Sequence, residues 1–424
     1  MTGRRHVNRA SFMLLQSLAA IVVLFVANEL AGGDEPPAVG TTKGQPSWQP
    51  GTTHRFDGLE VQLSKPVVVA RSKGHLWFPC LYRTSTGDLL AIASADPDVY
   101  TDNLTGLASW STDGGLSWSP PFRANYGDVF VSQSNGDAIC LPYTLFHREG
   151  GIANTVVLLA RGSRTPVVRS EGLLVTGFAK RGQPNPKNAA AAGFVFNGDA
   201  IPLKDGSHLA TMYGNYEGEK RSTLLVARSE DGLQWRILST VAGSDSPLFG
   251  EDGPSEASVC RLKDGRIMAV FRLAGYTRYG QTFSSDEGKT WTTPVKMKGP
   301  WSVQPSLVTL PSGVILLSGG RPGLFLWVNR AGDGQAWEQV DLRANHNAAQ
   351  PQDYIHESEN ITEHTPGHHF RHETSSYTQT VLLDGGQAMI IYDRGPHGGE
   401  KIDPVMPETN SLWVVKVRIR AAKL

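Results

Sequence analysis

One short phrase recurs along the chain and limits the folds open to it more than any other feature. It reads SSDEGKTW from Ser284 to Trp291 and STDGGLSW from Ser111 to Trp118. A copy one residue shorter, SEDGLQW, runs from Ser229 to Trp235, and a degenerate copy, GDGQAW, ends at Trp337. In each copy Asp can bond local backbone amides, Gly can take a positive φ, and Trp can pack inward. The phrase therefore predicts a repeated hairpin turn.

A second repeat accompanies the first, a glycine turn followed at once by an apolar run. Its copies are TGDLLAIAS around Gly87, KDGSHLATMY around Gly206, KDGRIMAVFR around Gly265, PSGVILLSGG around Gly313 and DGGQAMIIYD around Gly385. Each copy reads as two adjacent antiparallel strands joined by a short turn. A composition of 46 Gly, 26 Pro and 10 Trp in 424 residues also favours many short strands over long helices.

The spacing of the repeats predicts six units. The interval from Trp118 to Trp235 is about twice that from Trp235 to Trp291, so one unit lacks a recognisable turn phrase. That unit should occupy roughly residues 135 to 195, with CLPYTLF and NTVVLLARG as its strands. We therefore expect an all-β fold, a six-bladed β-propeller of four-stranded antiparallel blades. A β-sandwich or a β-solenoid is the alternative.

Closure of such a ring removes the open sheet edges and needs one blade built from both ends of the chain. The early apolar segment Leu59–Val69 and the late segment Leu412–Arg420 have the pattern of strands. We expect these two segments to meet in the closing blade.

The phrase S-x-D-x-G-x-x-W is the Asp-box pattern, and on it the chain resembles the sialidase (neuraminidase) superfamily of BNR-repeat proteins. In that family Asp boxes are structural and face away from the catalytic side. The resemblance implies an exo-glycosidase that hydrolyses terminal sialic or other acidic sugars of extracellular glycans, with a tyrosine nucleophile and a retaining mechanism. The alternatives are a non-catalytic glycan-binding propeller and a hydrolase or lyase acting on a different sugar.

Glu256 and Arg272 lie at the two ends of one predicted hairpin, PSEASVCRLKDGRIMAVFR. Its turn, at Asp264 and Gly265, is near the midpoint and should bring the two ends together. The segment is similar to one in sialidases, where a glutamate and an arginine point from such a hairpin into the central funnel. The alternative is a structural ion pair.

The resemblance assigns the nucleophile to Tyr377 and the general acid to Asp102, with Asp98 as the second choice. A free phenol has a pKa near 10, so Tyr377 needs a neighbouring base, and Glu256 would supply it. Asp102 lies in the loop ADPDVYTDNLTGLASW and would protonate the leaving oxygen. Tyr is also an ordinary strand residue and Asp an ordinary turn residue.

Sialidases present three arginines to the substrate carboxylate, because a guanidinium matches a carboxylate bidentately. Arg272 and Arg321 match two of them. The third belongs in a Phe-Arg-Ile-Pro phrase, but here the phrase reads LWFP, with Trp77 in the arginine's place. Arg71, just upstream, is the candidate to replace it. Two guanidiniums with Trp77 stacking on a sugar ring would favour a neutral or uronic ligand.

The N-terminus predicts export. Arg4, Arg5 and Arg9 precede an apolar run from Phe12 to Ala27, the order of a signal peptide. This run is shorter than the roughly 20 residues that span a bilayer, which favours a cleaved signal over a permanent anchor. We expect a signal peptide over residues 1–33, a linker over 34–56 and the propeller over 57–424 of a secreted or periplasmic protein.

The net charge and the positions of the cysteines and histidines limit the kinds of partner and cofactor that we expect. The 40 basic and 40 acidic residues give no net field for nucleic acid, so a glycan is the expected partner. Cys80, Cys140 and Cys260 form neither a disulfide framework nor a C-x-x-C site, and we expect them buried. The six histidines of the segment from His346 to His372 match no metal spacing. We expect no metal or cofactor and a loop over the substrate face there.

Overall fold

Almost all regular structure in this protein is β-strand, as the sequence predicts. The structure is a computed structural model that describes residues 47–96, 105–185, 188–246, 248, 252–273, 277–301, 303–321, 323–356, 377–395 and 410–421. In these ranges 27 strands form five hydrogen-bonded sheets, with a single α-helix, α1 (Leu342–Ala349). Two short 3-10 turns, η1 (Pro351–Asp353) and η2 (Asp384–Gly386), complete the described elements.

Three sheets have four strands each, connected in chain order by antiparallel pairing. They are β4 (Trp77–Arg83), β5 (Leu89–Ser94), β6 (Thr105–Ser111) and β7 (Phe122–Asn125); β17 (Ser255–Arg261), β18 (Ile267–Arg272), β19 (Arg278–Ser284) and β20 (Val295–Trp301); and β21 (Ser306–Thr309), β22 (Ile315–Gly319), β23 (Phe325–Asn329) and β24 (Glu338–Asp341). The predicted glycine turns join the first two strands, with φ of 94° at Gly87 and 91° at Gly265. The second sequence repeat is therefore confirmed as a hairpin.

A nine-stranded sheet consists of two antiparallel runs joined side by side. Its strands are β8 (Val129–Ser132), β9 (Ala138–Leu141), β10 (Phe146–Arg148), β11 (Gly151–Leu159), β12 (Val167–Thr176), β13 (Phe194–Pro202), β14 (His208–Gly214), β15 (Thr223–Ser229) and β16 (Gln234–Ala242). The runs join where β12 pairs in parallel with β16. The first run lies where a unit without a turn phrase is predicted, but it begins at Val129, earlier than the predicted start near residue 135.

The six-stranded sheet joins both ends of the chain. Its strands are β1 (Pro50–Phe56), β2 (Leu59–Ser64), β3 (Val67–Ser72), β25 (Thr378–Leu383), β26 (Gln387–Arg394) and β27 (Asn410–Ala421). Both β2 and β3 pair antiparallel with β27, which confirms that the early and late strands meet. β1 lies within the predicted linker and pairs with β2, because the chain turns back at Gly58 with a φ of 69°. The sheet region therefore starts at Pro50 instead of residue 57.

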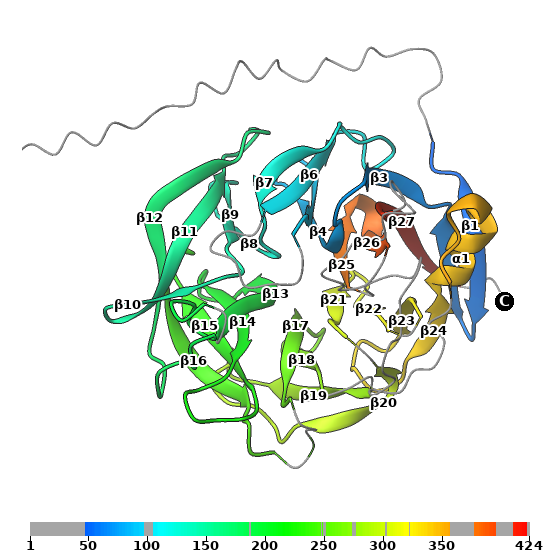
Figure 1. Ribbon diagram of the computed structural model, residues 1–424. Coiled ribbons are helices and arrows are strands. Elements are labelled where there is room, and N and C mark those ends of the chain that lie inside the picture. The colour runs from blue at the N-terminus through cyan, green and yellow to red at the C-terminus, as the bar shows by residue number, and fades with distance from the viewer. Residues whose placement is uncertain are drawn as a thin grey trace, which may run out of the picture. The chain divides into compact units, whose positions relative to one another are not determined.

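The first strands of the antiparallel runs follow one another around a common centre (Figure 1). β25 contacts β4 and β21, β17 contacts β21 and β13, and β13 contacts β8. The Tyr126 hydroxyl, just before β8, donates to the Phe78 carbonyl of β4 at 2.9 Å. The inner strands thus form a continuous ring of contacts.

Four of these inner-strand contacts use the same hydrogen bond, from a backbone N–H of one strand to a polar side chain of its neighbour. The bonds run from Leu81 N to Gln379 Oε1 (2.6 Å), from Thr380 N to Ser306 Oγ (2.9 Å), from Leu307 N to Ser258 Oγ (2.8 Å) and from Val259 N to Asp199 Oδ2 (3.2 Å). Each bond satisfies a buried backbone donor that strand pairing within the sheet leaves free. These bonds fix the inner strands relative to one another.

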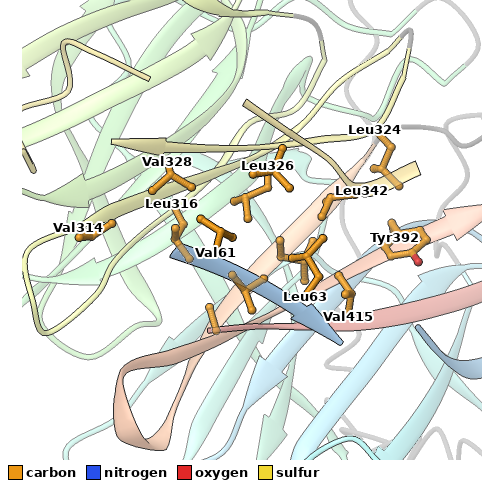
Figure 2. Close-up of a cluster of buried hydrophobic side chains, with 14 of the residues drawn as sticks. Val61, Leu63, Val314, Leu316, Leu324, Leu326, Val328, Leu342, Tyr392 and Val415 are labelled. Carbon is orange, nitrogen blue, oxygen red and sulfur yellow. The ribbon is translucent and has the colours of Figure 1, made fainter. Parts of the chain in front are cut away.

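A hydrophobic cluster seals the junction of the two chain ends with the neighbouring sheet (Figure 2). Val61 of β2 and Val415 of β27 pack with Leu316 of β22 and Val328 of β23, each at most 1% exposed. Burial of a side chain of this size stabilises the fold by about 1.5–3 kcal/mol. The sheet that closes the ring is therefore held by packing as well as by strand pairing.

Helix α1 begins at the end of β24, where the Asp341 side chain accepts a hydrogen bond from Ala344 N. It contains His346, so this part of the segment predicted to be an irregular loop is helical. No helix among the described residues is long and apolar enough to span a bilayer. Cys80, Cys140 and Cys260 are free thiols and buried, as predicted.

Candidate functional site

Three predicted residues converge at the centre of the ring. Glu256 Oε1 accepts hydrogen bonds from Arg272 Nη1 at 3.0 Å and from the Tyr377 hydroxyl. The other carboxylate oxygen, Oε2, accepts from the backbone N–H of Gln304 at 3.0 Å. Glu256 and Tyr377 are 121 residues apart in the sequence. The ring of sheets therefore builds this contact, as the sequence predicts.

A bulge in the first strand of its sheet aims Glu256 at Tyr377. Ser255 pairs with Arg272, and the register then shifts between Ser255 and Ala257. Glu256 lies in that shift and has a φ of 33°, a conformation that non-glycine residues rarely adopt. Bulges re-aim single side chains out of the strand alternation. The distortion places the carboxylate, only 4% exposed, against the phenol of another sheet.

Phe78 reaches the same phenol by the same device. The register of β4 and β5 shifts between Trp77 and Cys80, and Phe78 has a φ of 52°. Its ring lies 4.5 Å from the Tyr377 ring, centroid to centroid. Among the described residues Glu287 is the one other non-glycine residue with a positive φ. Two of the three backbone outliers therefore touch Tyr377, and such strain concentrates at functional sites.

The surroundings keep the Tyr377 phenol protonated. Burial raises its pKa well above the ordinary value, and the negative charge of Glu256 raises it further. Arg272 and Arg321 act in the opposite direction. Because the phenol keeps its proton, it acts as the donor to Glu256. The proton can pass to the carboxylate only as another group takes up the developing charge on the phenol oxygen.

Two guanidinium groups lie beside this phenol. Burial is the largest influence on the pKa of Arg272 and would lower it, but the net shift is upward, because the charge and hydrogen bond of Glu256 act with smaller influences from Tyr377 and Tyr213 in the opposite direction. The guanidinium therefore stays a cation. Arg321 is 4% exposed, and its Cζ lies 5.8 Å from the centroid of the Tyr377 ring. A cation at this distance is attracted to the face of the ring. The site combines one carboxylate, one phenol and two cations.

Two other predicted residues have different places from those expected. Trp77 is buried behind Phe78, with ring centroids 4.2 Å apart, and its indole N–H donates to the Asp96 carbonyl at 2.9 Å. The bulge turns Phe78 to Tyr377 in its place. Arg71 forms a bidentate ion pair with Asp353, at 2.9 and 2.7 Å, so that carboxylate takes up the cation. Neither residue supplies a third guanidinium beside Tyr377.

The predicted general acid, Asp102, and its alternative Asp98 lie outside the described residues. Their place relative to Glu256 therefore stays a prediction.

The amino-acid sequence of this chain matches a family model. The model for the BNR repeat-like domain aligns with residues 176–390, half of the chain. The chain belongs to the BNR repeat-like domain family. The predicted resemblance to BNR-repeat proteins of the sialidase superfamily is thereby confirmed. No curated protein matches this BNR repeat protein.

Solved structures with the same fold include several glycosidases. A protein of unknown function from Dyadobacter fermentans has a TM-score of 0.61 at 19% identity, covering 84% of this chain and 99% of its own. The NanB sialidase from Streptococcus pneumoniae has a TM-score of 0.51 at 14% identity, covering 82% and 70%. The GH93 α-L-arabinofuranosidase of Fusarium graminearum gives 0.55 at 14%, covering 84% and 97%. At these identities the likeness is one of fold.

A hydrogen-bonded chain that sequence reasoning missed supports Glu256 in the BNR repeat protein. Asn197 Nδ2 donates to Asp128 Oδ2 at 2.7 Å and to Gln304 Oε1 at 3.1 Å, and Gln304 N then donates to Glu256. A signal was present, since each of the first three residues stands beside a short apolar strand, in GDVFV, FVFNGD and SVQPSLV. Nothing in a single strand, however, indicates that these polar residues meet.

His346, the first histidine of the predicted loop, has a structural place. Its ring nitrogens bond the Tyr392 hydroxyl and the Asp353 carbonyl, each at 2.9 Å. Burial lowers the pKa of His346 to about 4, so the ring is neutral at physiological pH. The described residues contain no group of three or more metal-binding side chains. Residues 357–376, with the other histidines from His364 onward, lie outside the described ranges.

Proposed function

We propose that this protein is an exo-acting, sialidase-like glycoside hydrolase that removes terminal acidic sugars, sialic acid among them, from extracellular glycans. The observation that carries the proposal is the contact of the Tyr377 hydroxyl with Glu256, because a phenol paired with a buried carboxylate is an activated nucleophile. Two carboxylates are the usual equipment of glycosidases, and tyrosine-nucleophile sialidases are the known exception. The solved glycosidases with this fold are consistent with a glycan substrate.

The proposed reaction retains the configuration of the anomeric carbon in two displacements. Tyr377 passes its proton to Glu256 as its oxygen attacks, and the bond to the leaving oxygen breaks. That oxygen takes a proton from an acid, which we assign to Asp102 on the resemblance alone. Water then attacks the glycosyl-tyrosine bond and gives one proton to the acid's conjugate base, while Glu256 returns its proton to the phenol. Each residue ends as it began.

The two cations beside Tyr377 favour an anionic sugar. Arg272 and Arg321 can bind a carboxylate bidentately. A second candidate follows from Phe78, whose ring lies against the phenol in the part of the site where the family pattern has an arginine. An aromatic wall there fits the apolar face of a neutral or uronic sugar. A hydrolase or lyase on such a sugar, or a glycan-binding module without catalysis, is therefore the alternative.

A substrate panel tests the proposal. The purified protein is incubated with chromogenic sialoside, uronide and arabinofuranoside, beside its Tyr377→Phe variant. We expect release from the acidic sugars and a loss of at least about a thousandfold in the variant. Release confined to the arabinofuranoside would select the neutral-sugar candidate. If the wild type releases nothing but binds the free sugars, the binding module is correct.

We also propose that the strands form a six-bladed propeller. Three four-stranded sheets, the two antiparallel runs of the nine-stranded sheet and the sheet with both chain ends make six such groups. On this view the parallel pairing of β12 with β16 links two neighbouring blades. An experimental structure with five or seven groups around the centre would contradict it.

Export of the mature protein is proposed from the sequence alone. The basic and apolar segments of residues 1–33 have the order of a signal peptide. N-terminal sequencing of protein from the native host should find a start at about residues 28–36. An intact Met1 on protein from the cell interior would argue against secretion.

A further inference from the structure

Asp128 and Asn197 form a buried pair near the centre of the ring. Both side chains belong to residues that are 3% exposed, and Asn197 Nδ2 donates to Asp128 Oδ2 at 2.7 Å. The same Nδ2 also donates to Gln304 Oε1 at 3.1 Å. With Asp128 Oδ2 and Gln304 Oε1 as the two acceptors, the end of the Asn197 amide that faces them is its nitrogen.

The second carboxylate oxygen of Asp128 (Oδ1) and the amide oxygen of Asn197 (Oδ1) are unusual, because both are buried and neither has a hydrogen-bond partner among the described residues. An ionised Asp128 is only an acceptor, so it would leave two acceptors in the same pair unsatisfied. Unsatisfied buried polar atoms are costly and rare in native proteins. A single proton on Asp128 removes the conflict, because Asp128 Oδ1 then becomes a donor.

We propose that Asp128 is a neutral carboxylic acid which forms a cyclic two-bond pair with the Asn197 amide, and that this pair positions Gln304 and thereby Glu256. In the pair, Asn197 Nδ2 donates to Asp128 Oδ2, and the proton on Asp128 Oδ1 is donated to Asn197 Oδ1. The amide is held at both ends. It can then present its second N–H to Gln304, whose backbone N–H donates to Glu256 Oε2.

The groups around Asp128 agree with a bound proton. The pKa of Asp128 is raised to about 7, mainly by burial and to a smaller extent by the carboxylates of Asp199 and Glu256. Hydrogen bonds from its own backbone N–H and from Asn197 act in the opposite direction and do not cancel the rise. Two other neighbours, the Cys80 thiol and the Tyr126 phenol, have a pKa well above their usual values and stay neutral. The pKa of the Cys140 thiol is likewise raised by burial. In the part of the chain that the structure describes, no cation lowers the pKa of Asp128.

The variant Asp128→Asn tests the pair directly. Its amide can donate to Asn197 Oδ1 and accept from Asn197 Nδ2, so it copies the protonated acid at every pH. Wild-type Asp128 has a raised pKa in the folded state, so its contribution to stability falls as the pH rises from about 4 to about 7 and stays low above that. The control Asp57→Asn makes the same change at a side chain that is 99% exposed.

We expect Asp128→Asn to unfold at the wild-type temperature at pH 4.5 and about 2–5 °C above it at pH 9. Asp57→Asn should show no such divergence. Asp199 is present in both proteins, so its own titration enters both unfolding curves and only its interaction with the Asp128 charge differs between them. A variant that is less stable than wild type at both pH values would overturn the proposal, because Asp128 would then be an ionised acceptor for some other donor.

A kinetic experiment tests whether Asp128 positions Gln304 and Glu256, and it rests on the proposed hydrolase activity. The unfolding experiment needs no substrate. If Asp128 ionises above about pH 7, the wild-type rate should fall on the alkaline side. In Asp128→Asn this alkaline fall should move upward by at least about one pH unit, with KM unchanged. An unchanged pH profile beside the expected stability shift would overturn the positioning role and leave the paired proton intact.

Discussion

The Asp-box turns and the central site are built in opposite ways. In the box from Ser229 to Trp235, Asp231 Oδ1 accepts from the N–H groups of Leu233 and Gln234 at 2.8 Å. The Trp235 indole donates to the Gly232 carbonyl at 2.9 Å. The partners of the Asp231 carboxylate and of the Trp235 indole N–H therefore lie within seven successive residues. At the centre, by contrast, Glu256 is held by Arg272, Gln304 and Tyr377, from three sheets.

A single loop can specify an Asp-box turn, because the bonds of the Asp carboxylate stay within that loop. Only the assembled ring of sheets can specify the central site. The Asp231 carboxylate satisfies donors of its own turn, so we expect its loss to act mainly on that turn. The centre contains buried charges that depend on partners from other sheets, and removal of one partner leaves the others unsatisfied. Substitutions at the centre should therefore affect activity and stability together, whereas substitutions in a box should affect stability alone.

Glu256→Gln should have the largest effect. The amide cannot accept the Tyr377 proton as a base, so kcat should fall by about 10²–10⁴. It also leaves Arg272 without its buried counter-charge, at a cost of about 2–3 kcal/mol in the free energy of unfolding. Turnover of the best substrate in the panel and urea unfolding measure the two effects. The control is Asp57→Asn, which makes the matching acid-to-amide change at a side chain that is 99% exposed and should change neither quantity.

Asp231→Ala should weaken the fold and leave the chemistry intact. The substitution removes the acceptor for two backbone N–H groups and for Ser229 Oγ, which should cost about 1–3 kcal/mol. The rate per folded molecule should not change, because the box makes no contact with Glu256 or Tyr377. Glu230→Ala, at an 82% exposed side chain of the same turn, is the control. A fall in kcat beyond about twofold would contradict the separation of box from site.

The same contrast explains which parts of the fold and of the site could be predicted from the sequence. The turns, the hairpins and the meeting of β2 with β27 could be predicted, because each depends on a local pattern or on the need for closure. The convergence of Glu256, Arg272 and Tyr377 followed from hairpin ends and the family resemblance. The orientation of Phe78 toward the phenol could not be predicted, because the sequence LWFP does not indicate a bulge with a positive φ. Asp128 and Asn197 were missed because they belong to the two different runs of the nine-stranded sheet, 69 residues apart in the sequence.

Asn329 gives a smaller and local test. In the degenerate box, Asn329 takes the serine's role: its Oδ1 accepts from Gly334 N at 3.0 Å, and its Nδ2 donates to the Ala336 carbonyl at 2.6 Å. This turn is longer than the others, since Ser284 bonds Gly288 four residues on and Asn329 bonds Gly334 five residues on. The hydroxyl of Asn329→Ser is too short to span it. We expect Asn329→Ser and Asn329→Ala to destabilise equally, by about 1 kcal/mol in urea unfolding. A neutral serine variant would indicate that the turn adapts.

The smallest expected effect is the pH dependence of one exposed box. Hydrogen bonds from Thr290, first from its hydroxyl and then from its backbone N–H, lower the pKa of Asp286 to about 2 from its ordinary 3.8. A carboxyl whose pKa is lowered by folding stabilises the protein above the unfolded value, and the contribution is lost as the pH falls from about 4 through about 2. Because the side chain is largely in solvent, screening should hold this contribution below about 0.5 kcal/mol. In urea unfolding, wild type should therefore exceed Asp286→Asn slightly at pH 6, and the difference should be clearly smaller at about pH 2.5 and vanish below about pH 2. Asp57→Asn, at a 99% exposed side chain outside the box from Ser284 to Trp291, should show no such change. A difference that persists undiminished at pH 2.5 would mean that the Asp286 charge does not contribute to the stability of the turn.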